Sequence, residues 1–381
     1  MLPSIHTPIL VLDPGLGTTL TNQPHNQSFD TSTPLWSSHL LITSPSTLSA
    51  AHASFVDAGA DVILTATYQA SFEGFSRTKR SGRRDDEAVR SGKEEIGEES
   101  GYGRDEATQY MRSAVPLAVS AFSAPTLSSP RQPRIALSLG AYGATLTPSA
   151  EYSGVYPASM STRSALTQWH ADRLSVFTSD EPTWDSVEFV AFETVRKAEE
   201  VRGIRDVMAG LQREGKGGKI WWICCVVPRE VTEQEEVRGL VRAMLAPTLS
   251  EQGAEEVGRP WGVGVNCSSV SKVSWVVSVF EEEVRRMVEQ HEFVNEWENG
   301  NAVGPWLVIY PDGADGLVYN TSTMEWEEGG DKVDGEWDEM VWNVVKGARD
   351  SGVWAGVVVG GCCKTGPEEI RRLRLKVDAG G

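Results

Sequence analysis

Eight short apolar runs, each followed after a loop by a helix-like stretch, constrain the fold of this 381-residue chain more than any other feature. The runs are nearly continuous in apolar residues rather than alternating with polar ones, which indicates strands buried on both faces of a parallel sheet. Eight such units predict an α/β fold of the (β/α)8 TIM-type barrel class, although a doubly wound open sheet would give the same alternation. The predicted strands are Ile9–Leu12, Asp61–Thr65, Arg134–Leu139, Val187–Phe192, Ile220–Cys225, Gly262–Asn266, Trp306–Tyr310 and Gly352–Val359.

Helix-like patterns occupy the stretches between these strands. Ser46 is the predicted N-cap of the first helix, and Pro367 suits the first turn of the last one. The predicted helices are Ser46–Ala58, Ala165–Phe177, Arg196–Arg213, Glu233–Leu245, Val270–Gln290, Trp337–Ser351 and Pro367–Leu375, with one more near Glu106–Phe122.

Three stretches break the alternation, and we interpret them as surface insertions in a single barrel domain that spans residues 1–381. They are residues 75–133, 294–305 and 312–336, and all are rich in Gly, Ser, Pro or acidic residues. Such composition favours mobile surface segments.

The charge and hydropathy patterns argue against nucleic acid and membranes as partners. The formal net charge is −18 and no sustained stripe of Lys and Arg occurs, which argues against nucleic-acid binding. An acidic protein instead favours the approach of cationic small molecules. The N-terminus lacks a basic segment followed by an apolar one, and no eighteen apolar residues run together. We therefore expect no membrane association and a cytoplasmic location.

Three of the five cysteines follow predicted strands at the end of the barrel where active sites form. Cys267 follows the sixth strand, and Cys362 and Cys363 follow the eighth. Three converging thiolates suit tetrahedral Zn²⁺ and leave a fourth position open, as catalytic zinc sites do. Their spacing alone is equally compatible with small buried core residues. The pair Cys224 and Cys225 lies inside an apolar run, where plain packing is expected.

Other residues that could bind a ligand are weaker indicators of a functional site. Asp13 and Gly15 belong to a turn that could bind a ligand, and Glu151 and Glu193 could bind an ammonium group, but each could equally serve a structural or solvated role. None of the six histidines falls at a predicted strand end, so hydrolase triads have little support. The glycine patterns match neither the dinucleotide fingerprint nor a Walker A loop. The cysteine count does not suggest a disulfide scaffold either.

Segments at the strand ends follow one another in a distinctive order along nearly the whole chain. Taken together, they resemble the homocysteine S-methyltransferase family. The segments are Val11–Leu20, His52–Ser71, Gly140–Ala144 with Glu151–Gly154, Phe192–Thr194, Gly264–Ser268, Tyr310–Asp312 and Gly360–Thr365.

The resemblance implies a (β/α)8 barrel that holds one Zn²⁺ per chain on Cys267, Cys362 and Cys363. It further implies that Asp13 and Glu151 meet the amino group of homocysteine. Backbone amides of the loop that contains Gly15 would meet its carboxylate. The remaining substrate-binding residues expected from the resemblance are Thr67, Tyr152, Glu193 and Asn266.

The implied reaction moves a methyl group from a sulfonium donor, S-methylmethionine or S-adenosylmethionine, to homocysteine and gives methionine. Only the thiolate of homocysteine attacks carbon, and zinc stabilises that form, so no acid or base residue is required. Aromatic faces could hold a cationic donor. The candidates at the barrel mouth are Tyr68, Tyr142, Tyr152 and Tyr310.

Three departures from the family pattern keep alternatives open. Pro14 replaces a residue that would carry an N–H, Ala66 stands where Asn is frequent, and Arg196 stands where Pro is common. One alternative is a donor with a quaternary ammonium group such as betaine, or a corrinoid-linked one. Another is a zinc-binding barrel without catalysis that serves a binding or regulatory role. The sequence leaves the preferred donor and the oligomeric state open.

Overall fold

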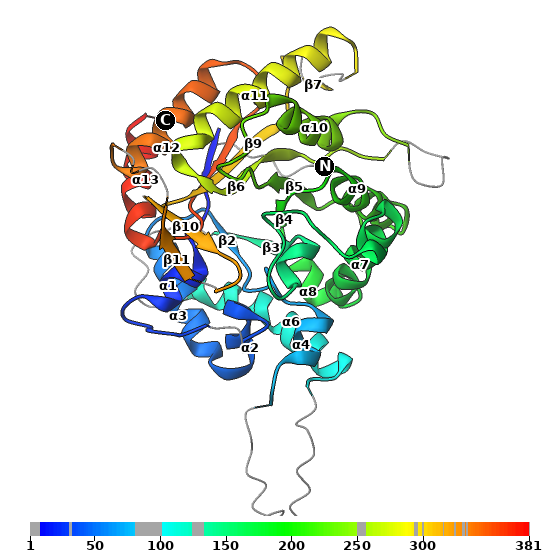
Figure 1. The fold of residues 1–381 in the computed structure, drawn as a ribbon, viewed down its shortest axis with the longest axis vertical. Coiled ribbons are helices and arrows are strands. Elements are labelled where there is room, and N and C mark those ends of the chain that lie inside the picture. Colours follow the sequence, from blue (N-terminus) through cyan, green and yellow to red (C-terminus); the bar gives the residue numbers. More distant parts are fainter. Residues whose placement is uncertain are drawn as a thin grey trace, which may run out of the picture.

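The computed structural model describes residues 8–29, 33–80, 101–123, 133–249, 257–292, 296–298, 301–314, 316–323, 325–329, 332 and 334–380. Eight parallel strands follow one another in the order β1-β12-β9-β6-β5-β4-β3-β2 (Figure 1). A parallel bridge between Leu12 and Val62 joins the two ends of this sheet into a nearly closed barrel. The predicted barrel is therefore confirmed, and the open-sheet alternative is excluded. The strands are β1 (Ile9–Val11), β2 (Val62–Leu64), β3 (Arg134–Gly140), β4 (Phe189–Val195), β5 (Ile220–Cys225), β6 (Gly262–Ser269), β9 (Trp306–Asp312) and β12 (Val357–Val359).

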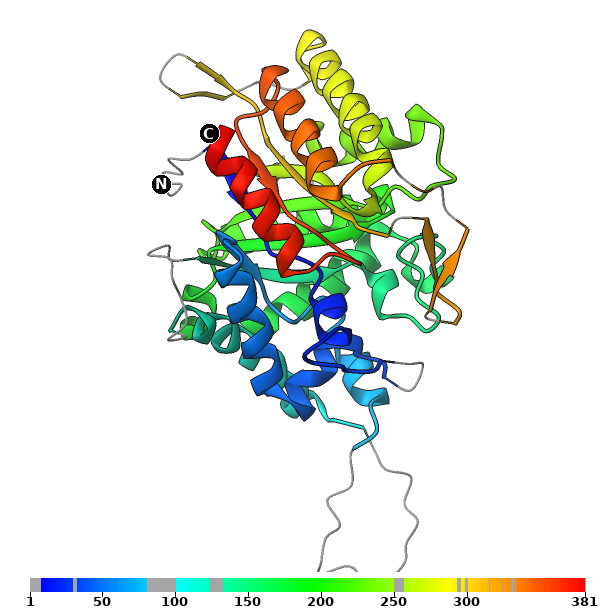
Figure 2. The same cartoon turned by 90° about the vertical axis from the view of Figure 1, so that its left-hand side faces the viewer.

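Helices surround the barrel and cover the outer faces of the strands (Figures 1 and 2). All eight predicted helices are present within a few residues of their expected ends. The first begins at Pro45 with Ser44 as its N-cap, so the choice of Ser46 was wrong. Proline is favoured in the first helical turn because its missing N–H would be unpaired there anyway. The α-helices are α1 (Leu16–Thr21), α2 (Leu40–Thr43), α3 (Pro45–Asp57), α4 (Phe72–Arg77), α6 (Arg104–Ser120), α7 (Arg163–Thr178), α8 (Glu181–Asp185), α9 (Ala198–Arg213), α10 (Gln234–Leu245), α11 (Val270–Glu289), α12 (Trp337–Asp350) and α13 (Pro367–Gly380).

Burial on both faces of the strands explains their nearly continuous apolar sequences. Alternate residues point into the barrel, where Phe189, Trp222 and Tyr310 are among the buried side chains that fill the interior. The intervening residues, such as Val11 and Val190, pack outward against the helices. The barrel interior is thus a packed core, and ligands must bind at one of its ends.

The three interrupting stretches contain secondary structure. Residues 75–133 include α6, as predicted, while residues 81–100 and 124–132 lie outside the described ranges. Residues 294–305 include the antiparallel pair β7 (Glu296–Glu298) and β8 (Asn301–Val303). Residues 312–336 include a second antiparallel hairpin, β10 (Leu317–Asn320) with β11 (Glu325–Glu328). Among the helices that the structure describes, none is long and apolar enough to cross a membrane.

Candidate active site

A cavity of about 310 Å³ opens at the carboxyl ends of the barrel strands. The loops that follow β1, β2, β3 and β12 contribute to its wall, as do residues of the strands β3, β4, β6 and β9 and the β10–β11 hairpin. This is the end at which TIM-type barrels bind ligands. The charged, thiol and tyrosine side chains around it are Asp13, Tyr68, Glu151, Tyr152, Glu193, Cys267, Tyr310, Tyr319, Cys362, Cys363 and Lys364.

An irregularity in β6 places Cys267 in this wall. The pairing of β6 with β9 shifts register between Asn266 and Ser269, and Cys267 adopts a positive φ of 47°. Bulges of this kind redirect a side chain next to many active sites. The side-chain amide of Asn266 accepts the Thr194 N–H at 2.7 Å and donates to the Cys267 Sγ at 3.4 Å. The Asn266 amide therefore holds the end of β6 against the end of β4.

Close contact between the loops after β1 and β12 places Cys362 and Cys363 opposite Cys267. A Cβ at Gly15 would lie 2.2 Å from the Cys362 carbonyl oxygen, so only glycine lets the loop after β1 approach the loop after β12 this closely. The Cys362 N–H donates to the Pro311 carbonyl at 3.0 Å, and the Gly313 N–H donates to the Cys363 carbonyl at 2.8 Å. The loop after β1 and the end of β9 with the following Gly313 thus fix the backbone of the cysteine pair.

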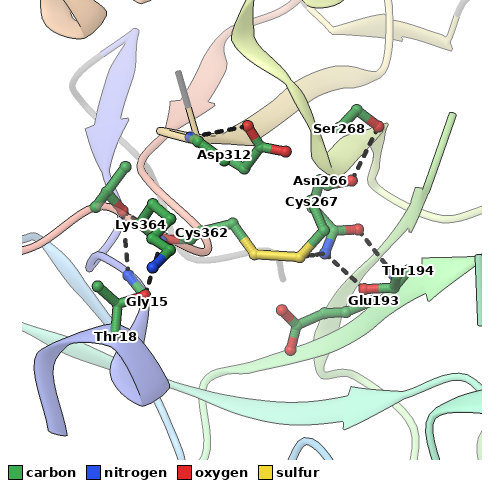
Figure 3. Close-up of a disulfide and its surroundings, with 12 residues drawn as sticks. Gly15, Thr18, Glu193, Thr194, Asn266, Cys267, Ser268, Asp312, Cys362 and Lys364 are labelled. Carbon is green, nitrogen blue, oxygen red and sulfur yellow. Dashed lines mark hydrogen bonds between the residues drawn. A yellow bond between two sulfur atoms is a disulfide. The ribbon is translucent and has the colours of Figure 1, made fainter. Parts of the chain in front are cut away.

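The three sulfur atoms form a cluster. The Sγ atoms of Cys267, Cys362 and Cys363 all lie within 4.8 Å of one another. Cys267 and Cys362 are joined as a disulfide with their Cα atoms 5.5 Å apart, and Cys363 is free (Figure 3). Burial, with the nearby carboxylates of Asp312 and Glu151 adding to it, raises the pKa of the Cys363 thiol to about 12. A nearby cation is therefore needed for Cys363 to exist as a thiolate at neutral pH.

Three buried carboxyl groups line the cavity beside the sulfur cluster. Burial raises the pKa of Glu151 and of Glu193 to about 7 each, and raises that of Asp13 well above its usual range, with the Glu193 charge adding to the shift at Asp13. Asp13 Oδ2 accepts the Leu64 N–H at 3.0 Å, while Asp13 Oδ1 and Glu151 Oε2 have no hydrogen-bond partner in the described part of the chain. Unpaired buried carboxylate oxygens are costly unless a ligand pairs with them, so this wall suits a cationic group.

A buried hydrogen-bond network supports the loop that carries Glu151. Glu200, at the start of α9, accepts hydrogen bonds from the Tyr142 N–H and the Tyr156 hydroxyl at 2.6 Å each, and its Oε1 lies 3.0 Å from His170 Nε2. The turn at Tyr142–Thr145 in turn accepts the Ala150 N–H through the Gly143 carbonyl at 2.9 Å. The network therefore ties the loop after β3 to α7 and α9.

The structure brings most of the predicted site residues together but places a few outside the cavity wall. Asp13, Gly15, Glu151, Tyr152, Glu193 and the three cysteines all line the cavity. Thr67 lies behind it, and its hydroxyl donates to the Ser138 carbonyl at 2.7 Å. Asn266 and Tyr142 do not line the cavity either: the Asn266 side chain bonds Thr194 and Cys267, and the Tyr142 ring packs edge-on against Tyr156 and Trp169. Direct substrate contact by Thr67 and Asn266 stays a prediction.

Sequence reasoning missed the aromatic residues at the cavity mouth. Tyr319 and Trp326 from the β10–β11 hairpin lie with their ring centroids 5.3 Å apart, and Phe29 and Trp36 form a similar pair at 5.8 Å. All four line the cavity. The two aromatic residues of the hairpin lay in a stretch that we interpreted as an insertion. The available signal was two short segments, Leu317–Asn320 and Glu325–Glu328, each with an aromatic residue and separated by a short connection, which is typical of a hairpin.

Comparisons with known proteins point to one family. The family model described as homocysteine S-methyltransferase matches residues 10–377. Homocysteine S-methyltransferase 2 of Arabidopsis thaliana is 26% identical, with 96% of this chain and 92% of that protein covered. Selenocysteine Se-methyltransferase of Brassica oleracea var. italica is 24% identical, with 96% and 88% covered. The metallated form of the homocysteine methyltransferase MmuM from Escherichia coli shares the fold, with a TM-score of 0.62, 19% identity and 97% of each chain covered.

Proposed function

The chain belongs to the homocysteine S-methyltransferase family, and from this premise we propose that it transfers a methyl group from a sulfonium donor to homocysteine at a zinc ion. The observation that carries the proposal is the cluster of Cys267, Cys362 and Cys363 sulfur atoms in the wall of the cavity. The family match runs almost from end to end, which supports our interpretation of the chain as one barrel domain.

The donor set fits zinc. Zinc–sulfur bonds of about 2.3 Å place tetrahedral sulfurs roughly 3.8 Å apart, which is compatible with the 4.8 Å limit within which the three Sγ atoms lie. Cys267 and Cys362 can act as ligands only after their disulfide is reduced, because the metal binds thiolates. The competent form is therefore the reduced one. When bound, the ion would stabilise the thiolate form of homocysteine.

Chain residues would orient the amino acid. The free oxygens of Asp13 and Glu151 are positioned to accept hydrogen bonds from the ammonium group of homocysteine. A bound ammonium would also favour the ionised carboxylates and lower the raised pKa values of both groups. Fixing the ammonium would aim the substrate sulfur at the donor, which is a positioning effect.

The cavity also favours a cationic donor. The faces of Tyr68, Tyr152 and Tyr310 and the carboxylate of Glu193 line it, and aromatic faces and carboxylates attract sulfonium groups. In the reaction the homocysteine thiolate forms a new bond to the methyl carbon. The bond from that carbon to the sulfonium sulfur breaks, and its electron pair leaves with a neutral thioether. No side chain has to move a proton in this step.

The direct test is methionine formation from homocysteine and S-methylmethionine by the reduced, zinc-loaded protein. Cys363→Ala should lose zinc and turnover together. Cys225→Ala is the matched control, because Cys225 is a buried core residue away from the cavity, and it should keep both. If the wild type binds zinc but methylates homocysteine with neither a sulfonium donor nor betaine, the chain is a zinc-binding protein without this activity.

A further inference from the structure

The charged groups around the cavity are unbalanced. Three carboxyl groups line it, whereas Lys364 is the sole Lys or Arg among the described residues of its wall. Homocysteine and S-methylmethionine each carry an ammonium group, which suits those carboxyl groups, and a carboxylate, which they repel. A cation beside the substrate carboxylate would offset this repulsion.

Backbone N–H groups near the sulfur cluster can donate to this carboxylate but carry no net charge. Pro14 has no N–H, and the Gly15 N–H already points to the Thr365 hydroxyl oxygen at 3.3 Å. Leu16, Gly17 and Thr18 line the cavity, and their N–H groups precede the first hydrogen bond of α1, from Thr19 to Gly15. A positive charge for the carboxylate has to come from another segment.

Lys364 is held at the right place to supply it. Its backbone has a positive φ of 60°, and its N–H donates to the Thr18 hydroxyl at 2.7 Å (Figure 3). This contact joins the residue after the cysteine pair to α1, beside the loop that carries Pro14 and Gly15. The turn thus fixes where the side chain leaves the backbone, next to Cys363.

The Lys364 ammonium group lies at the cavity mouth. Its Nζ is 5.3 Å from the centre of the Trp326 ring, and Trp326 packs against Tyr319 of the same hairpin. No carboxylate pairs with Lys364 among the residues that the structure describes. An ammonium on an aromatic face keeps its hydrogen-bond donors available for an incoming anion.

We propose that Lys364 binds the α-carboxylate of an amino-acid substrate at this site. The inference deepens the proposed function and rests on it. Homocysteine and an amino-acid sulfonium donor both carry an α-carboxylate, so either could be the partner of Lys364. Analogues of each substrate that lack the carboxylate show which of the two binds Lys364.

The test compares each substrate with its decarboxylated analogue in the wild type and in Lys364→Met. For the acceptor, calorimetry on the reduced, zinc-loaded protein measures the Kd of homocysteine and of 3-aminopropane-1-thiol. For the donor, the KM of S-methylmethionine is compared with that of (3-aminopropyl)dimethylsulfonium. In at least one arm, the variant should bind the carboxylate compound roughly 10-fold to 100-fold more weakly, which is the range for a hydrogen bond between charged groups. Affinity for the matching analogue should not change.

Three controls make the result specific. Lys364→Arg keeps the charge and should restore most of the affinity. Lys346→Met removes the same charge from an exposed position on α12 and should behave as the wild type. Zinc content and circular dichroism show that Lys364→Met remains folded and metallated; if it does not, Lys364→Gln takes its place in the comparison.

The inference is overturned if the variant weakens the carboxylate compounds and their analogues equally, or weakens neither. If the wild type shows no turnover but still binds homocysteine more tightly than 3-aminopropane-1-thiol, the result would instead contradict the proposed function alone. A wild-type protein that binds neither thiol would contradict both.

Discussion

We expect recognition of the homocysteine ammonium to depend on Glu151, because one of its oxygens is buried in the cavity without a hydrogen-bond partner among the described residues. Glu151→Gln keeps the shape of the side chain and removes its charge. We expect the KM for homocysteine to rise roughly 10-fold to 100-fold with little loss of bound zinc, because a charge-assisted hydrogen bond is lost. Steady-state kinetics and zinc analysis measure the two effects.

Glu199→Gln is the matched control for Glu151→Gln, since Glu199 lies on the outer surface at the start of α9 and pairs with Arg202. It should leave both values unchanged. An unaltered KM in Glu151→Gln would remove Glu151 from the binding site.

His52 on α3 makes stability depend on pH. Its side chain is fully buried, neither ring nitrogen has a hydrogen-bond partner in the described structure, and burial lowers its pKa from 6.5 to about 4. Between these two values the unfolded chain binds a proton that the folded chain does not. The free energy of unfolding should therefore fall as the pH drops from 6.5 to 4, by up to ~3 kcal/mol from this residue alone.

The comparison that isolates His52 uses urea unfolding of the metal-free, reduced protein at pH 7.5 and pH 4.5. His52→Leu should lose less stability than the wild type when the pH is lowered. Removing the metal keeps zinc release from contributing to the pH dependence. Equal losses in the two proteins would show that His52 does not titrate in this way.

At the level of elements, we expect the proposed metal site to depend on how closely the loop after β1 approaches the loop after β12. Gly15→Ala places a Cβ 2.2 Å from the Cys362 carbonyl oxygen, and backbone atoms cannot move aside cheaply. The variant should therefore bind zinc roughly 10-fold to 100-fold more weakly, as is typical when the support of metal ligands is disturbed. Competition with a chromogenic chelator measures this affinity.

The control for Gly15→Ala is Gly239→Ala in α10, where a new Cβ meets nothing within 4 Å. It should keep zinc affinity and gain up to ~1 kcal/mol of stability, because alanine is the better helix former. Wild-type zinc affinity in Gly15→Ala would mean that the two loops do not position the cysteines.

Across the whole molecule, the sequence predicted the barrel because strands buried on both faces leave continuous apolar runs. The apolar runs predicted the ends of the strands less accurately than the presence of the strands. β4 and β6 continue to Val195 and Ser269, beyond the predicted ends, because irregular pairing carries the strands through polar residues such as Glu193 and Ser268. The last predicted strand began too early, since the residues from Gly352 to Gly356 are in part apolar but do not pair in the sheet.

The candidate site, like the fold, could be predicted from the sequence only in part. Sequence order and strand ends were enough to select Cys267, Cys362 and Cys363, because a barrel brings all strand ends to one face. A motif does not reveal whether a polar group points to the cavity or to a neighbouring loop, so the sequence could not indicate that the Thr67 hydroxyl donates to Ser138 or that the Asn266 amide bonds Thr194. The β10–β11 hairpin reaches the cavity through tertiary packing, which local sequence does not encode.

X-ray absorption spectroscopy at the zinc edge tests the central claim most directly. The reduced, zinc-loaded protein should show three sulfur ligands and one lighter ligand, and addition of homocysteine should change the set to four sulfurs. The same experiment with Cys363→Ala should show no such site. A sulfur count that homocysteine does not change would contradict the account, because the substrate thiolate would then be activated somewhere other than at the three cysteines.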